Sequence, residues 1–321
     1  MTGKIRTLTA VTALVGLVAF LLMAGSNAAP AAAVPSDPQP LPPTGVPWRD
    51  QIYYGAAPSG GGSLPVLVFV HGMGGIAQDW WGPTQFSGTN DMYTAAYNAG
   101  YRTAFVNLND TGERWPLKSM WQNGRTLARQ IGAIADYYGV ATVDLVTHSK
   151  GGVDSQAAVA HYGAASRVRN IFMLSSPNHG SEIADLGFDT ALGRLILGLL
   201  GWDGAGNDIY LMTTSYMARF RELTDPRTED DAVNYYWAGG TDIGPQGSPL
   251  RMSGRYLSRN FGPNDGLVTV ASAELAGSNS HQLFVQPFNH DNIRKGSTAF
   301  PYIDAIARQT AGASLAGAAS R

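Results

Sequence analysis

Short continuous runs of apolar residues alternate along the chain with longer segments whose apolar residues recur every three or four positions. A continuous run of about four to eight residues is typical of a strand buried on both faces, whereas the longer spacing is typical of an amphipathic helix. The predicted strands are 66–70, 103–108, 142–147, 170–175, 233–239 and 282–288. Helices are predicted at 91–98, around 127–138, at 153–161 and from Pro301 onward. This alternation predicts an α/β fold in which helices cover both faces of a mostly parallel central sheet.

The two ends of the chain lack this pattern. Lys4 and Arg6 precede an apolar run of 15 residues, Ala10 to Ala24, and small residues follow it. Because a membrane span needs about 20 apolar residues, we expect a secretory signal peptide over 1–33, cleaved between 28 and 33, and therefore a secreted, extracellular protein. The Pro-rich stretch 34–47 predicts an extended leader, 48–312 one α/β domain, and the small residues of 313–321 a disordered tail.

The charge of the chain argues against binding to nucleic acid, and its lack of cysteine excludes disulfide bonds. The chain has 22 Lys and Arg against 24 Asp and Glu, a net charge of −2, and no basic run, so nucleic acid is not an expected partner. It has no cysteine, so disulfide bonds cannot stabilise it. We expect it to be a monomer.

The stretch "THSKGG" (147–152) places Ser149 between a predicted buried strand and a predicted helix. A serine there turns sharply, and Gly151 and Gly152 allow the helix to begin close to the sheet. This is the pattern of a nucleophile elbow, which presents Oγ at the carboxyl edge of the sheet, although Thr147 replaces the first glycine of G-x-S-x-G. The alternative interpretation is a serine that caps the helix and has no catalytic role.

A nucleophilic serine needs a base, an acid and an oxyanion hole. In this fold type the chain order is serine, acid, histidine, and of the late histidines His290 follows the last predicted strand whereas His281 precedes it. His290 is therefore the expected base. Asp242 and Asp265 both follow the fifth predicted strand, and the residues alone leave the choice of acid open.

Backbone amides are the expected oxyanion donors. The stretch "FVHGMGG" (69–75) follows the first of the six strands, and its glycines allow the amide of Met73 to point inward. The amide of Lys150, next to the nucleophile, is the expected second donor. A simple glycine turn without a catalytic role is the alternative.

Several stretches together resemble the secreted bacterial triacylglycerol lipases of the α/β-hydrolase fold. They occur in that family's order over about 65–295: "VFVHGMGG", "VTHSKGG", "SSPNHGSEIAD", "VNYYWAGG", "NDGLVTVASA" and "NHDNI". The resemblance implies a carboxylic ester hydrolase that forms an acyl-enzyme on Ser149, with His290 as base and Asp265 rather than Asp242 as acid, and no cofactor.

The chain also departs from that family. Many members hold calcium through an aspartate two positions after the catalytic histidine, whereas Asp291 follows His290 directly and no partner carboxylate is identifiable. We therefore expect no metal, and no obligatory calcium in particular.

The segment 180–222 between two predicted strands is too long for a plain connection. It contains the apolar stretch "LGRLILGLLGW" (192–202), which must pack either on the core or over a cleft as a lid. A lid would favour a lipase acting on an ester substrate at an oil–water interface. An extracellular polyester (polyhydroxyalkanoate) depolymerase, a phospholipase or a short-chain carboxylesterase would use the same catalytic residues, and a catalytically inactive binding protein is the alternative from another class.

Overall fold

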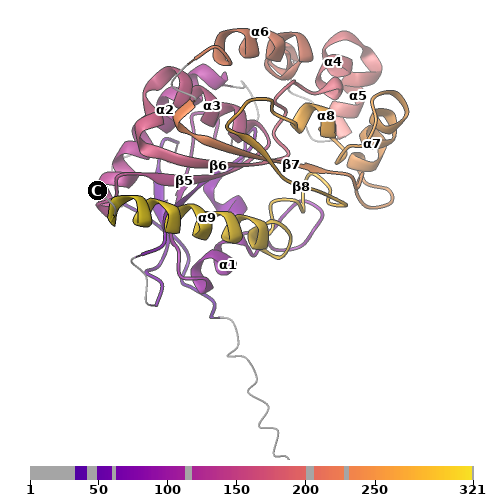
Figure 1. Ribbon diagram of the computed structural model, residues 1–321. Helices are drawn as coiled ribbons and strands as arrows, with labels where there is room; N and C mark the ends of the chain where they lie inside the picture. The colour runs from indigo at the N-terminus through magenta and orange to yellow at the C-terminus, as the bar shows by residue number, and fades with distance from the viewer. Residues whose placement is uncertain are drawn as a thin grey trace, which may run out of the picture. The chain divides into compact units, whose positions relative to one another are not determined.

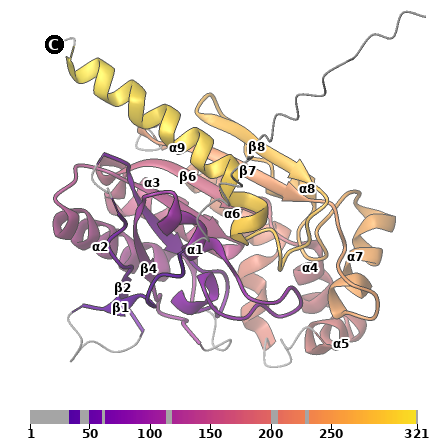
Figure 2. The same ribbon diagram turned by 90° about the horizontal axis from the view of Figure 1, so that it is seen from below.

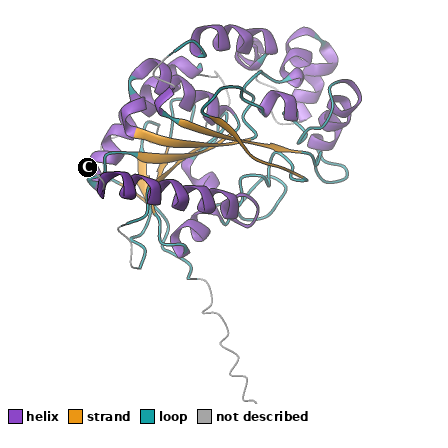
Figure 3. Cartoon of the chain, viewed as in Figure 1, coloured by secondary structure: helices purple, strands orange, loops and turns teal. Residues whose placement is uncertain are grey.

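A single eight-stranded sheet organises the computed structural model, which describes residues 33–41, 49–59, 63–112, 118–199, 206–227 and 231–319. The strand order is β1-β2-β4-β3-β5-β6-β7-β8; strands β3 to β8 are parallel, and β1 and β2 pair antiparallel at one edge. The strands are β1 (Gln39–Pro40), β2 (Ile52–Tyr54), β3 (Val66–Val70), β4 (Arg102–Val106), β5 (Val143–His148), β6 (Val168–Leu174), β7 (Asn234–Gly240) and β8 (Ser280–Gln286). The predicted fold class is confirmed, with helices on a mostly parallel sheet (Figure 3), and strands lie at the six predicted places. The sixth, β8, is not buried as its apolar run suggested: Phe284 is its one buried residue.

Helices cover both faces of this sheet (Figure 1). They are α1 (Met92–Asn98), α2 (Met120–Tyr138), α3 (Lys150–Tyr162), α4 (Glu182–Asp189), α5 (Ala191–Leu199), α6 (Thr214–Thr224), α7 (Pro249–Asn260), α8 (Val270–Ala273) and α9 (Gly296–Ala319). Figure 2 shows α9 and α1 together on the face opposite α2 and α3. No helix in the described part of the chain is long and apolar enough to cross a membrane.

Successive side chains of β3 point to opposite faces of the sheet and therefore belong to two different hydrophobic cores. Val66, Val68 and Val70 pack with the apolar face of α2, whereas Leu67 and Phe69 pack with α1 and α9. All five of these strand residues are fully buried, which explains why the strand is a continuous apolar run rather than an alternating one. A third apolar cluster lies among α4 to α7 and includes Leu197, Ile209 and Leu250.

The ends of the elements differ from the prediction in three places. Helix α9 begins at Gly296, not at Pro301, and continues to Ala319 through the predicted disordered tail. Helix α3 begins directly at Lys150. The leader predicted at 34–47 is Pro-rich but partly packed, because Gln39–Pro40 pairs with β2 and the Ser36 carbonyl accepts from Tyr93 Oη at 2.9 Å. The predicted signal peptide lies outside the described residues, except for Ala33.

Candidate active site

Ser149 occupies a strained turn between β5 and α3. Its φ of 52° and ψ of −131° lie in a region that non-glycine residues rarely adopt. The Ser149 amide donates to the Leu174 carbonyl at 3.0 Å, which holds the turn against β6. A Cβ on Gly151 would overlap the carbonyl of His71, and one on Gly152 would overlap the hydroxyl of Ser176. The two glycines after the serine are therefore required for the close approach that the sequence predicted.

Asp265 and His290 form a buried hydrogen-bonded pair. His290 Nδ1 lies 2.7 Å from Asp265 Oδ2, and the His290 amide donates to the Asp265 carbonyl at 2.9 Å. Asp265 Oδ1 accepts from the amides of Leu267 at 2.9 Å and Val268 at 2.8 Å. Burial alone would raise the pKa of Asp265, but the charge of protonated His290 and these hydrogen bonds outweigh it and lower the pKa below its ordinary value.

Asp242, the other candidate acid, has different partners. Its Oδ1 accepts from the Gly244 amide at 3.1 Å, and its Oδ2 accepts from the side chain of Asn289 at 3.3 Å. His281 lies at the start of β8, exposed, with its ring 5.3 Å from that of Tyr236. The structure thus brings Asp265 to His290. Asp242 instead forms a turn, and His281 lies at the surface.

Ser149 and His290 line a cleft of about 510 Å³, together with Met73, Leu250 and Asp291. A second, smaller space of about 30 Å³ adjoins Ser149 and His290 and is lined by Met73, Lys150, Ile209 and Met212, among others. Gly72 forms the wall directly beside the elbow, since a Cβ there would come within 3.1 Å of Ser149 Cβ. Ser149, His290, Met73 and Lys150, all predicted from the sequence, therefore lie together at one place.

The two residues predicted to donate their amides to an oxyanion lie in a tight turn (Met73) and at a helix start (Lys150). Met73 is in a tight turn closed by the Gly75 amide and the Gly72 carbonyl at 3.1 Å, and Gly74 has the positive φ of 61° that the turn requires. Lys150 is the first residue of α3, where amides have no partner within the helix. Such amides at a helix start also favour developing negative charge.

His148 is a buried residue whose role the sequence did not reveal. Its Nε2 lies 2.8 Å from the carbonyl of His290, and the two rings are 4.7 Å apart. Burial, followed by the positive charges of protonated His290 and of Arg294, lowers the pKa of His148 well below its ordinary value, so it stays neutral. A neutral His148 that donates from Nε2 fixes the backbone of His290.

Comparison with solved structures shows which family the chain belongs to. Lipase BlEst2 of Bacillus licheniformis, in its mature form, is 33% identical with a TM-score of 0.71, and the match covers 81% of this chain and 98% of that one. The chain belongs to the bacterial lipases and esterases of the α/β-hydrolase fold. It is a serine carboxylic ester hydrolase.

The propeptide form of the same lipase is 34% identical with a TM-score of 0.70, over 81% of this chain and 54% of that longer chain. Searches of protein-family models and of curated proteins found no match. The lipase and esterase assignment therefore rests on the similarity to BlEst2 in its two forms.

Calcium, which many lipases of the resembled family hold near the catalytic histidine, does not fit the residues present here. Both oxygens of Asp291 are used, because the amides of Gln85 and Phe86 donate to them at 3.1 and 2.7 Å. Arg294 lies 3.4 Å from the same carboxylate, and its positive charge opposes a cation. Within the described ranges, no group of three or more His, Cys, Asp or Glu could hold a metal ion. That the enzyme needs no calcium remains a prediction.

The insertion of this esterase forms α4, α5, a short 3-10 helix (Gly206–Met212) and α6. Leu197 of α5 is buried and fills the space beside Gly187, where a Cβ would overlap it. The expectation that the whole apolar stretch is packed is wrong for Leu195 and Leu199, whose exposed fractions are 61% and 47%. Trp202 and the side chains of Leu192 and Ile196 lie outside the described part of the structure.

Proposed function

We propose that this ester hydrolase is a secreted triacylglycerol lipase with Ser149 as nucleophile, His290 as base and Asp265 as the acid that orients the base. The observation that carries the catalytic assignment is the 2.7 Å contact between Asp265 and His290, made beside the cleft that Ser149 lines. Buried acid, imidazole and strained serine are the parts that activate a serine in such enzymes. We further propose that it acts as a monomer without a cofactor or an obligatory calcium ion.

The reaction proceeds in two halves. In the first, Ser149 Oγ attacks the ester carbonyl while His290 Nε2 takes the hydroxyl proton, and the amides of Met73 and Lys150 stabilise the oxyanion. His290 then gives the proton to the alcohol, which leaves. In the second half, His290 takes a proton from the water that attacks the acyl-enzyme, and then returns this proton to Ser149 Oγ as the bond between Ser149 and the acyl group breaks and the carboxylic acid is released. Throughout, Asp265 keeps the proton of neutral His290 on Nδ1 and stabilises the imidazolium when it forms.

The exposed apolar residues of α5 favour a lipase over an esterase for soluble substrates. Exposed apolar surface costs about 25 cal/mol per Å², so Leu195 and Leu199 are disfavoured in water and favoured against oil. They lie on the same helix as Leu197, which packs in the apolar cluster that also contains Ile209 and Met212 of the small space beside Ser149. An oil surface that binds α5 would therefore contact a helix that packs with residues lining this small space beside Ser149.

The double variant Leu195→Glu/Leu199→Glu tests this substrate assignment. Both side chains are exposed, so the variant should fold, which thermal unfolding would check. Hydrolysis of an emulsified long-chain triglyceride should fall, because two carboxylates at the surface of α5 oppose contact with oil. Hydrolysis of a soluble butyrate ester should stay near that of the wild type.

A matched control is Val34→Glu/Leu41→Glu, which adds the same charges at exposed apolar positions beside β1. This control should hydrolyse emulsion and soluble ester as the wild type does. If the α5 variant also kept its full rate on emulsions, α5 would have no role at an interface and a carboxylesterase would become the better assignment.

A polyester depolymerase is the second candidate, favoured by one observation. Phe188 and Tyr210 of the insertion are both partly exposed, and their rings are 5.4 Å apart. Exposed aromatic rings are suited to a flat polymer surface. Release of acid from a polyhydroxyalkanoate film, at a rate above that on triglyceride emulsions, would favour this substrate.

A further inference from the structure

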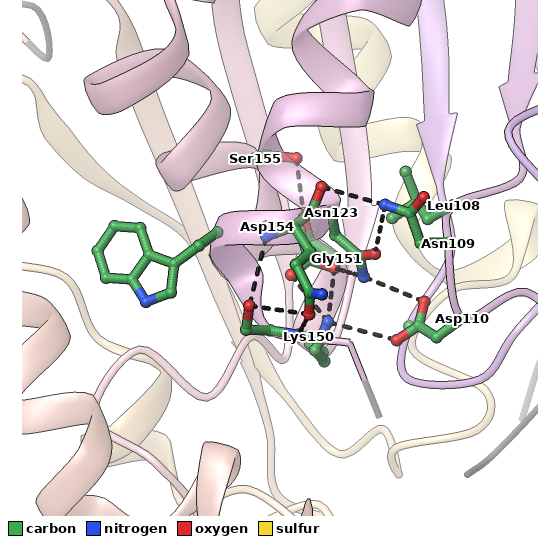
Figure 4. Close-up of polar contacts among 12 residues, drawn as sticks. Leu108, Asn109, Asp110, Asn123, Lys150, Gly151, Asp154 and Ser155 are labelled. Atoms are coloured by element: carbon green, nitrogen blue, oxygen red, sulfur yellow. Dashed lines mark hydrogen bonds and ion pairs between the residues drawn. The ribbon is translucent and has the colours of Figure 1, made fainter. Parts of the chain in front are cut away.

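The side chain of Lys150 is buried behind the elbow, in a polar cluster that the proposed chemistry does not use. Its Nζ lies 2.9 and 3.0 Å from the two carboxylate oxygens of Asp154 and 3.5 Å from Asp110 Oδ2 (Figure 4). Asn123 of α2 donates to both carboxylates, to Asp110 at 3.0 Å and to Asp154 at 2.9 Å. We call Lys150, Asp154, Asp110 and Asn123 the Lys150 cluster.

The charges of this cluster are costly to bury. The side chains of Lys150, Asp154 and Asp110 are at most 2% exposed, and two carboxylates face one ammonium. Burial raises the pKa of Asp154 to about 6, against the opposing charge of Lys150. Because a buried ion pair is often no more stabilising than apolar residues of the same volume, stability alone does not account for this arrangement.

Asp110 belongs to a loop, Leu108–Gly112, that follows β4 and also holds the turn containing Met73. The Leu108 amide donates to His71 Nε2 at 3.2 Å, and Thr111 Oγ1 lies 2.9 Å from the same nitrogen. His71 Nδ1 in turn lies 2.7 Å from the carbonyl of Gly72. The Gly112 amide donates to the carbonyl of Gly75 at 3.2 Å. One loop is therefore bonded to both sides of the site, to Lys150 on one side and to the Gly72–Gly75 turn on the other.

We propose that Asp110 is a positioning residue for the oxyanion hole: the loop Leu108–Gly112 sets the spacing between the amides of Met73 and Lys150. The proposal rests on the proposed function, in which those two amides bind the oxyanion. Pre-set donors stabilise charge only when they lie at the right distance from the oxygen that develops it. Asp110 touches neither substrate nor reacting atoms, so it acts through Lys150, whereas Thr111 in the same loop acts through His71.

The experiment compares Asp110→Ala with Asp110→Asn, which keeps an oxygen for Lys150. Loss of a whole oxyanion donor costs about 10²–10³ in kcat, so displaced donors in Asp110→Ala should cost about 10–100-fold. KM for a soluble butyrate ester should hardly change, because the ground-state carbonyl carries little charge. Affinity for an alkyl boronic acid, whose adduct with serine is tetrahedral and anionic, should fall in parallel with kcat. Asp110→Asn keeps an oxygen for Lys150 but turns its NH₂ group toward the NH₂ of Asn123, so it should recover part of both.

A second variant keeps the test decisive if Asp110→Ala folds poorly. Thr111→Val keeps the shape of the side chain and removes only the bond to His71, so it should lower kcat and boronic acid affinity together. The matched control is Asp144→Ala, which breaks a buried 2.6 Å ion pair with Arg169 near the start of β5, the strand that ends at His148. It should lower the melting temperature yet leave kcat and boronic acid affinity near those of the wild type.

Two results would overturn the proposal: unchanged kcat in both Asp110→Ala and Thr111→Val, or an equal loss of kcat in Asp144→Ala. Either result, with Ser149→Ala inactive, would remove the positioning role and leave the proposed function intact. An active Ser149→Ala would instead remove the proposed function itself.

Discussion

Asp265→Asn is the change that tests the proposed acid most sharply, because the structure decides how the new amide must lie. Oδ1 of Asp265 accepts from two backbone amides, of Leu267 and Val268. An NH₂ group in that place would face two donors, so the amide oxygen takes the Oδ1 position. The NH₂ group then faces His290 Nδ1, which has to accept, and the imidazole proton moves to Nε2. In this tautomer Nε2 cannot take the proton of Ser149.

The expected loss follows from this tautomer change. In serine proteases the equivalent substitution lowers turnover by about 10⁴, and at about 1.4 kcal/mol for each tenfold this corresponds to about 5.5 kcal/mol of transition-state stabilisation. Stability should change far less, because both backbone amides keep an acceptor. The variant should therefore be folded and nearly inactive.

The assay measures kcat and KM on a soluble chromogenic butyrate ester, with thermal unfolding of each variant alongside. Asp242→Asn is the matched control, because Asp242 accepts only from Gly244 and Asn289. It should stay within about twofold of the wild type, as expected for a turn residue away from the reacting atoms. A larger loss in Asp242→Asn than in Asp265→Asn would refute the assignment of the acid.

Four further predictions concern the other groups at the site. Ser149→Ala should abolish ester hydrolysis and labelling by an organophosphonate while thermal unfolding stays nearly unchanged; retained activity would place the nucleophile elsewhere. His290→Ala should lose as much activity as Ser149→Ala because the two act as a unit, whereas exposed His281→Ala should be mild, and the reverse order would mean that the base is wrongly assigned. Asp291→Asn should lower the free energy of unfolding at neutral pH by about 1–3 kcal/mol. The pKa of Asp291 is lowered in the folded protein, so its carboxylate stabilises the fold at pH values above its ordinary pKa. This stabilisation is lost as the pH falls through the pKa of Asp291 in the folded state. Urea unfolding should thus show the stabilities of wild type and Asp291→Asn converging below about pH 4, and a gap that stays constant would contradict a stabilising role of the Asp291 hydrogen bonds to Gln85 and Phe86. A chelator should leave wild-type activity and melting temperature unchanged, and a drop that added calcium reverses would contradict this.

The serine and the histidine of the site could be predicted because their signals are local. A buried strand, a serine and two glycines stand next to one another in the chain around Ser149, and His290 directly follows the last strand. The acid could not be derived in this way, because Asp242 and Asp265 lie in similar turns. Only the resemblance favoured Asp265, and only the fold shows which carboxylate reaches His290.

Partners that are distant in sequence explain what the sequence did not reveal. Asp291 binds amides 205 and 206 residues away, and Lys150 pairs with Asp110 across 40 residues. Nothing in the local pattern around Asp291, Lys150 or Asp110 marks these contacts.

Local rules also gave wrong expectations at the edges of elements. A proline is tolerated at the edge of a sheet, so Pro40 can lie in β1 although its neighbourhood suggests an unpaired leader. Proline is common at the first position of a helix, so the sequence suggested that the last helix begins at Pro301. In the structure α9 begins five residues earlier, at Gly296, and Pro301 lies inside it. For Leu195 and Leu199, apolar character predicted burial, but both are exposed, and this exposure is what motivates the proposed action at an oil surface.

The order of the proposed catalytic groups along the chain has a consequence for synthesis. Ser149 leaves the ribosome long before His290, which follows the last strand, β8. The separation is 290 − 149 = 141 residues, and at about 5–20 residues per second it takes about 7–28 s to translate. During that interval the nascent chain carries a serine with no base to activate it. The capacity to hydrolyse esters is thus acquired late in translation, once the residues up to His290 have been made.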